Sequence, residues 1–278
     1  MAKRILVAVI FVPILLGIIL FLPSFWWALV VMFISGMAAF ELLRATGEGK
    51  ITIPMRVVTL LSAVLIPLGN WWGQAVPVAF VCLFVVMAVS FWCAIRAYNE
   101  GDASIGFYHV MLTLFAGCVI PLGLSTLVQL RGMDYGRYLV LLAVLLSFIT
   151  DGAAYFGGIF LGRHRGVTRV SPKKSVEGYI CGFLGGAVFA VLYGLVIGAI
   201  EGCTVKLIPL ALCGLLGALF TELGDLVFSF IKRQYGIKDY GHLLPGHGGM
   251  LDRFDSMILC APVVLFIVYY LPVFGQGI

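Results

Sequence analysis

The sequence predicts an all-α integral membrane protein that crosses the bilayer about nine times. Of its 278 residues, 62% are hydrophobic and only 11% are charged, and the mean hydropathy is +1.10. A soluble domain carries about 25% charged residues. Apolar runs of about 20 residues, the length of a membrane helix, recur along the whole chain. Seven cysteines are scattered without a CxxC pair, and we interpret them as helix-packing residues.

The apolar runs are separated by polar loops, turns and prolines. The first run follows the basic pair Lys3-Arg4, and we interpret it as a retained span because it is long and no A-x-A cleavage pattern follows it. Trp71 and Trp72 close the third run, as expected at a membrane interface. The predicted spans are 5–22, 25–43, 57–68 with its flanks and interrupted by Pro67, 76–95, 107–130, 138–161, 178–200, 207–230 and 257–273.

The positions of the basic residues predict that the N-terminus is cytoplasmic. With nine spans in this orientation, all but three of the 18 lysines and arginines lie at the N-terminus or in cytoplasmic loops, the exceptions being Arg131, Arg137 and Lys206. This distribution follows the positive-inside rule. The net charge of +5 therefore reflects membrane orientation, and we expect no nucleic-acid partner.

The distribution of acidic residues within the apolar runs changes near residue 138. Intramembrane acids are nearly absent before it, whereas Asp151, Glu222 and Asp225 lie within or near the ends of later apolar runs. An unpaired carboxylate inside a bilayer costs several kcal/mol, so each is a candidate functional residue. We therefore expect residues 1–137 to form a scaffold, lipid-facing and dimerisation bundle, and residues 138–278 to form the catalytic region.

The sixth span and the loop after it hold the first candidate site. Asp151 lies on a narrow face of small and polar residues, and helix packing alone does not require a charge there. In the basic loop that follows, Ser171, Lys173 and Lys174 precede the seventh span and are suited to bind phosphate oxygens. A solvated loop or unselective binding of anionic headgroups is the alternative.

The second candidate site runs from Glu222 to Asp255. Acids, a hydroxyl and two cations follow at three- and four-residue spacing, and a glycine-rich loop comes next. Asp225 and Asp252 are predicted to converge on a divalent cation, because oxygen ligands suit Mg²⁺. The glycines let backbone N–H groups approach a phosphate. No zinc spacing is present, so His247 is predicted to donate a hydrogen bond to an oxyanion. A helix hairpin with a cap and a salt bridge accounts for Asp255 alone.

These residues resemble the signature of the phosphatidate cytidylyltransferases, or CDP-diacylglycerol synthases. The matching residues are Ser229, Lys232, Arg233, Lys238, Asp239, Gly241, Leu244 to Gly249, Leu251, Asp252, Arg253 and Asp255. Asp151 with Ala154-Tyr155, the run Ser171 to Ser175, Glu177-Gly178 and Gly224-Asp225 are similar too, whereas Lys3-Arg4 and Ala39-x-Glu41 match less closely. The chain departs from the family pattern at Ala153 and Val176.

The resemblance implies transfer of CMP from CTP to phosphatidic acid with release of pyrophosphate. It implies Mg²⁺ as cofactor, with a second cation left open, a homodimer, and a location in the inner membrane with the active site facing the cytoplasm. The implied catalytic residues are Asp151, Asp225, Lys232, Arg233, Lys238, Asp252 and Arg253, with Asp225 and Asp252 holding the metal and Asp151 as a candidate third acid. The implied substrate-binding residues are Ser171, Lys173, Lys174, Ser229, His247, Gly248 and Gly249.

Two other functions share some of these sequence features. A CDP-alcohol phosphotransferase needs an arginine where Tyr155 stands and further acids that this chain lacks. An ion-coupled carrier uses buried acids as well, but its typical paired half-sequences are absent, and the charges gather on one side.

Overall fold

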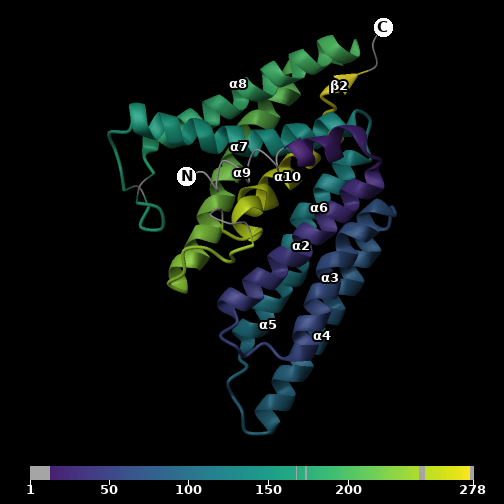
Figure 1. Cartoon of the computed structure of the whole chain (residues 1–278), viewed down its shortest axis with the longest axis vertical. Helices are drawn as coiled ribbons and strands as arrows, with labels where there is room; N and C mark the ends of the chain where they lie inside the picture. Colours follow the sequence, from purple (N-terminus) through teal and green to yellow (C-terminus); the bar gives the residue numbers. More distant parts are fainter. Residues whose placement is uncertain (1–12, 167, 173, 244–247, 276–278) are drawn as a thin grey trace. The chain divides into compact units, whose positions relative to one another are not determined.

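The protein is predominantly helical in its computed structural model, which describes residues 13–166, 168–172, 174–243 and 248–275. The elements are α2 (Ser24–Thr46), α3 (Ile53–Trp71), α4 (Ala75–Asn99), α5 (Phe107–Leu114), the π-helical turn η1 (Phe115–Val119), α6 (Ile120–Arg131), α7 (Gly136–Phe160), α8 (Val176–Glu201), β1 (Thr204–Val205), α9 (Leu207–Gln234), α10 (Leu251–Tyr270) and β2 (Phe274–Gly275) (Figure 1). The all-α class is confirmed.

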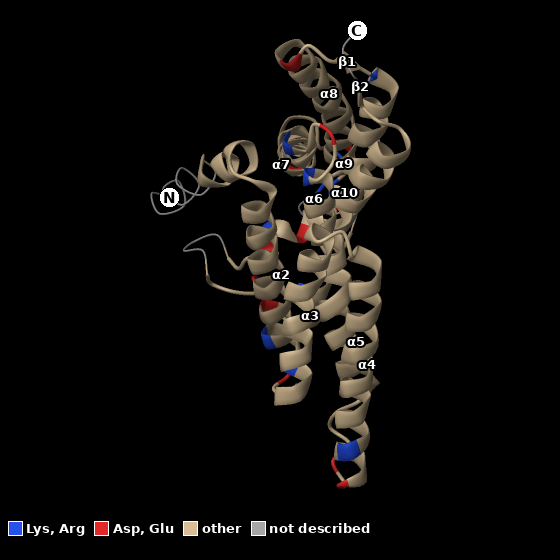
Figure 2. Cartoon of the chain, turned by 90° about the vertical axis from the view of Figure 1, so that its right-hand side faces the viewer, with Lys and Arg blue, Asp and Glu red and all other residues tan. Residues whose placement is uncertain are grey.

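Within the described residues, seven helices are long and apolar enough to cross a membrane. They are α2, α3, α4, the continuous segment α5–η1–α6, α7, α8 and α9. Figure 2 shows α4 without charge along most of its length, with blue and red only near one end. The chain is therefore a multi-pass membrane protein. Residues 5–12 of the predicted first span lie outside the described residues, and most of the predicted ninth span falls in α10.

The chain divides into two compact units, each described by itself. Unit 1 comprises residues 1–132 and 235–254, and unit 2 comprises residues 133–234 and 255–278. The first change of unit lies close to the predicted change of character at residue 138. The segment 235–254, which carries much of the signature, belongs to the same unit as the N-terminal helices.

In unit 1, α3 packs against α2, α4 and α6. The indole of Trp27 on α2 donates a hydrogen bond of 3.1 Å to the carbonyl of Leu127 on α6. The hydroxyl of Ser62 on α3 donates a bond of 2.8 Å to the carbonyl of Gly117 in η1. Gly117 lies so close to Thr59 that an added Cβ would be only 3.0 Å from its methyl group. The π-helical turn therefore lies at a close approach of α3.

The predicted interruption of the third span at Pro67 is wrong. Helix α3 continues through Pro67 to Trp71. The side-chain amide of Asn70 donates a bond of 3.2 Å to the carbonyl of Ile66, within the turn that contains the proline. Membrane helices tolerate proline because neighbouring helices and polar side chains satisfy the backbone groups that it disturbs.

In unit 2, α8 packs against both α7 and α9, and Figure 1 shows α7 and α8 running side by side. The hydroxyl of Tyr193 on α8 donates a bond of 2.8 Å to the carbonyl of Tyr138 on α7. Strands β1 and β2 pair antiparallel, with Thr204 opposite Gly275. Helix α9 extends four residues beyond the predicted eighth span, so Lys232 and Arg233 lie in its last turn.

Candidate active site

The first candidate site is an ion-pair cluster in unit 2. The ammonium of Lys174 lies 2.5 Å from Oε2 of Glu222 and 2.7 Å from Oδ2 of Asp225. The two acids are three residues apart on α9 and therefore share one face of that helix. Burial opposes the charge of Lys174, but Asp225 and Glu222 outweigh burial and raise the pKa of Lys174 above its ordinary value. The positive charge of Lys174 is therefore favoured by the two acids that it pairs with.

Asp151 on α7 faces the same cluster. The charges that act on it most strongly are those of Asp225 and Lys174. Gly182 on α8 makes room for the cluster, because an added Cβ would lie 3.2 Å from both the Cβ of Ala154 and Oε1 of Glu222. The structure thus brings the predicted residues Asp151, Lys174 and Asp225 together. It adds Glu222, whose side chain is only 3% exposed and which was noted in the sequence as an intramembrane acid without an assigned role.

A second ion pair in unit 2 joins α9 to α10. The ammonium of Lys232 lies 3.9 Å from Oδ2 of Asp255, and both side chains are buried. Oδ1 of Asp255 accepts a bond of 2.8 Å from the backbone N–H of Ser256. Gly224 allows the two helices to meet, since an added Cβ would lie 2.9 Å from the carbonyl oxygen of Asp255. The salt bridge considered for Asp255 is present, whereas Asp255 lies inside α10, five residues into the helix, and does not cap it.

The basic loop between α7 and α8 is tied to the end of α9. Nε of Arg233 donates a hydrogen bond of 3.4 Å to the carbonyl of Val170, next to Ser171. The N–H of Ser171 donates a bond of 3.2 Å to the hydroxyl of Thr168. Arg233 itself is exposed, so its guanidinium is accessible to a ligand from water. Ser229, one turn earlier on α9, is half-buried.

A separate candidate site is the signature loop in unit 1, organised by Asp252. Its Oδ2 accepts hydrogen bonds from the backbone N–H of Tyr240, at 2.8 Å, and of Gly249, at 3.0 Å. Gly248 has a φ of +83°, in the left-handed region where a side chain is strained. Asp252 therefore holds the glycine-rich loop against the start of α10. Asp252, Gly248 and Gly249 are all residues that the sequence predicts for the site.

Glu41 is the residue of the site that sequence reasoning missed. Its carboxylate is buried, and it accepts bonds from the N–H of Met250 at 3.0 Å and of Leu251 at 2.8 Å. These are N–H groups at the start of α10, which have no partner within the helix. Gly241 and Gly249 lie against the carboxylate, with no room for a Cβ. The available signal was an acid near the end of an apolar run.

The remaining predicted residues are distributed as follows. Lys238 and Arg253 are exposed in unit 1. Lys173 and His247 lie outside the described residues. No group of three His, Cys, Asp or Glu residues that could hold a metal occurs in the described part of the chain. Asp225 belongs to unit 2 and Asp252 to unit 1, so their joint role at a metal stays a prediction.

The fold and the charge clusters describe a multi-pass membrane protein equipped to handle phosphate groups near the membrane surface. Residues 2–271 match the cytidylyltransferase family, and the chain belongs to this family. It is 31% identical over 272 residues to a phosphatidate cytidylyltransferase of Bacillus subtilis, covering 96% of this chain and 97% of the relative.

Two further relatives are informative. A phosphatidate cytidylyltransferase of Thermotoga maritima is 42% identical over 134 residues, which cover 47% of this chain and 48% of that protein. An uncharacterized protein of Escherichia coli is 32% identical over 260 residues, which cover 88% of this chain and 85% of that protein. The similarity to enzymes of one name therefore extends along nearly the whole chain.

Proposed function

We propose that this protein transfers CMP from CTP to phosphatidic acid, giving CDP-diacylglycerol and pyrophosphate. The observation that carries this proposal is the charge cluster of Lys174, Glu222 and Asp225 in a chain that belongs throughout to the cytidylyltransferase family. The two named relatives are phosphatidate cytidylyltransferases. No specific observation favours the carrier or the CDP-alcohol phosphotransferase.

The reaction joins two polyanions. A phosphate oxygen of phosphatidic acid forms a bond to the α-phosphorus of CTP, and the bond from that phosphorus to the bridging oxygen of pyrophosphate breaks. The attacking phosphate is already ionised at neutral pH, so no general base is required. The protein's task is to position the reactants and to neutralise their charge. A site rich in fixed cations is therefore what the chemistry demands.

The cations take roles according to their surroundings. We assign the triphosphate or the leaving pyrophosphate to Lys232, Arg233, Lys238 and Arg253. Ser171, Lys173 and Lys174 are assigned to the phosphatidate phosphate or the nucleotide, and Ser229, His247, Gly248 and Gly249 to substrate oxygens. Lys174 has a further effect at rest: it offsets part of the negative charge of Glu222 and Asp225 and so reduces their repulsion of an incoming phosphate.

Mg²⁺ is the proposed cofactor, with a second cation as an addition. When bound, it would supply positive charge to the phosphate oxygens. The described residues fit an ion of this kind, because Asp225 offers a partly exposed carboxylate oxygen donor. Mg²⁺ is usually held by one or two carboxylates together with substrate phosphates. We assign Asp225 and Asp252 to it and keep Asp151 as a third candidate acid.

Nine spans with a cytoplasmic N-terminus complete the proposal. This arrangement places the basic loops and the reaction on the cytoplasmic side, where CTP is available. The charge distribution of the sequence supports it. We also propose that the protein lies in the inner membrane as a homodimer, through the resemblance stated above.

A direct assay tests the function. Purified protein in detergent is given CTP, phosphatidic acid and Mg²⁺, and CDP-diacylglycerol and pyrophosphate are measured. Asp225→Asn and Asp252→Asn are expected to lower kcat about 100-fold or more, as loss of a group that stabilises transition-state charge does. Asp134→Asn, an exposed acid outside both clusters, is the matched control and should retain full activity.

Each negative result has its own meaning. Full activity of either variant removes that aspartate from the metal site and leaves the enzyme assignment standing. A folded wild-type protein that forms no CDP-diacylglycerol overturns the function itself. Removal of Mg²⁺ with a chelator should abolish turnover, and turnover that persists would contradict the cofactor assignment.

A further inference from the structure

An apolar groove runs along one side of helix α2 in unit 1. Its volume is about 340 Å³, which lies in the range of about 300–1,000 Å³ that ligand pockets occupy. The residues that line it are Ile14, Leu15, Ile18, Leu22, Trp26, Leu29, Val30, Phe33, Ile34 and Met250. None of them is charged, so the groove is suited to a hydrocarbon and unsuited to a nucleotide or an ion.

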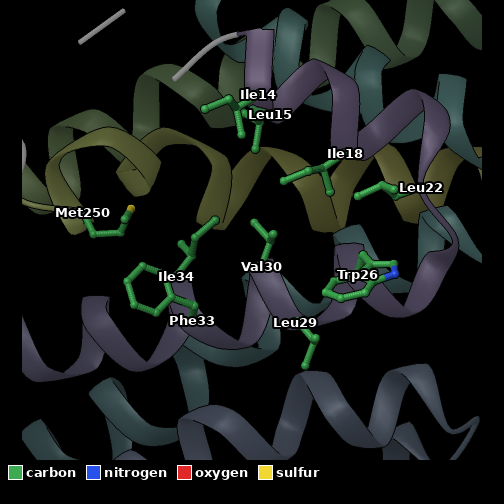
Figure 3. A pocket seen from close by; sticks show the side chains of 10 residues that line it. All are labelled: Ile14, Leu15, Ile18, Leu22, Trp26, Leu29, Val30, Phe33, Ile34 and Met250. Carbon is green, nitrogen blue, oxygen red and sulfur yellow. The ribbon is translucent and has the colours of Figure 1, made fainter. Parts of the chain in front are cut away.

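Figure 3 shows how the lining residues are arranged. Val30 lies in the middle, with Ile18 opposite it, while Trp26 and Leu22 lie at one end. Ile34 and Phe33 lie towards the other end, next to Met250. The groove therefore has two distinct ends: one formed wholly by N-terminal residues, and one that includes Met250.

Met250 connects the groove to the signature loop. It follows Gly249, whose N–H binds Asp252, and its own N–H is held by Glu41. Glu41 and Ile34 are seven residues apart on α2, two turns of one helix, so they share nearly the same face. One face of α2 thus supports the groove and, about two turns further on, the start of α10. All of these contacts lie within unit 1.

We propose that this groove binds an acyl chain of phosphatidic acid, with the glycerol phosphate at the Met250 end and the chain directed towards Trp26. The proposal rests on the proposed function and adds a binding site to it. A lipid whose phosphate lies beside Gly248 and Gly249, which are assigned to substrate oxygens, must place its acyl chains within reach of that loop. Of their two assigned roles, Ser171, Lys173 and Lys174 then take the nucleotide. The groove is the apolar surface that begins there, and a chain that leaves the bilayer for it gains van der Waals contacts with the lining residues.

The length of the substrate's acyl chains distinguishes a substrate-filled groove from a groove with another occupant. Val30→Phe adds bulk at the centre of the groove. It is expected to raise KM for dioleoyl phosphatidic acid about ten-fold, a discrimination of the size that a few methylene groups in an apolar pocket provide. KM for the short-chain dihexanoyl lipid, whose chains reach only the Met250 end, should change less than two-fold. Val30→Ala should leave the long-chain KM at or below the wild-type value.

Leu61→Phe is the matched control. Leu61 on α3 is exposed and does not line the groove, so both values of KM should remain as in wild type. The thermal midpoint of each variant in detergent is measured in parallel. Activity of every variant on the short-chain lipid shows that it is folded and that the proposed function holds.

Two results overturn the proposal. Equal losses for long- and short-chain substrates in Val30→Phe would mean that protein fills the groove and that the substitution only disturbs packing. Unchanged kinetics with both substrates would mean that the groove takes bulk bilayer lipid. Wild-type protein that is inactive with both lipids contradicts the proposed function instead.

Discussion

Glu41 connects two segments of unit 1 that are about 200 residues apart in the chain. Its two carboxylate oxygens accept the N–H groups of Met250 and Leu251. These N–H groups carry the positive end of the α10 dipole, where a carboxylate is stabilising. Gly249 and Asp252 lie directly before and after these two residues in the chain. Glu41 therefore fixes the loop on which substrate phosphates are proposed to lie. It is a positioning residue.

Replacing Glu41 by glutamine tests this role. Glutamine keeps one acceptor but turns an NH₂ donor towards an N–H donor, so one buried donor loses its partner. We expect a loss of about 1–3 kcal/mol in the free energy of unfolding. Turnover should also fall, because the loop is no longer held. Thermal unfolding in detergent and steady-state kinetics measure the two effects.

Glu100→Gln is the control for Glu41. Glu100 is an exposed acid that pairs with Arg96 at the end of α4, and exposed pairs contribute little to stability. It should match wild type in both measurements. If Glu41→Gln also matched wild type, the carboxylate would not position the loop.

At the scale of elements, glycines decide how closely the helices of unit 2 approach. A Cβ on Gly186 of α8 would lie 2.8 Å from the Cβ of Ala218 and 3.0 Å from Oγ1 of Thr150. The carbonyl oxygen of Gly186 would in turn lie only 2.6 Å from a Cβ added to Gly214 of α9. Small residues allow helices to pack backbone to backbone in membranes. Gly182, four residues earlier on α8, also borders Glu222.

Gly186→Ala should therefore separate α8 from α9. We expect a loss of about 1–3 kcal/mol in stability, the cost of forcing an extra methyl group into a packed interface. Gly152→Ala is the matched control, since a Cβ on this glycine of α7 meets nothing within 4 Å. Alanine there should be neutral or stabilising by up to about 1 kcal/mol. Equal thermal midpoints for the two variants would contradict the packing argument.

At the scale of the whole molecule, alternate loops should lie on opposite sides of the membrane. If α2, α3, α4 and the continuous segment α5–η1–α6 each cross once, the loops 47–52 and 100–106 face the cytoplasm, and the loops 72–74 and 132–135 face outward. This expectation follows from the basic residues of the sequence.

Cysteine labelling of intact cells tests the orientation. With Cys203, a native thiol between helices, replaced by serine, a membrane-impermeant reagent should label Gln74→Cys and Asp134→Cys directly. It should label Glu48→Cys and Asp102→Cys only after the membrane is opened. All four native residues are exposed. The reverse pattern would place the N-terminus outside.

Most elements and several site residues were predictable from the sequence. Membrane helices are encoded by long apolar runs, because the bilayer selects them by length and hydropathy alone. Asp151 and Asp225 were identifiable because a charge inside an apolar run is costly in a membrane and therefore marks a candidate functional residue. The exact helix ends differed, as for α9, because the last polar turn of a helix has no hydropathy signal.

The tertiary structure decided which residues meet. Lys174 pairs with Glu222 and Asp225 although 48 residues separate it from Glu222, and Glu41 holds a backbone more than 200 residues away. No local pattern encodes such contacts, because they depend on how helices pack and not on the period of one segment. By itself, the sequence determined the all-α membrane class, most of the helices and the candidate acids. The partner of each charge, and the groove beside Met250, were decided by packing within the two units.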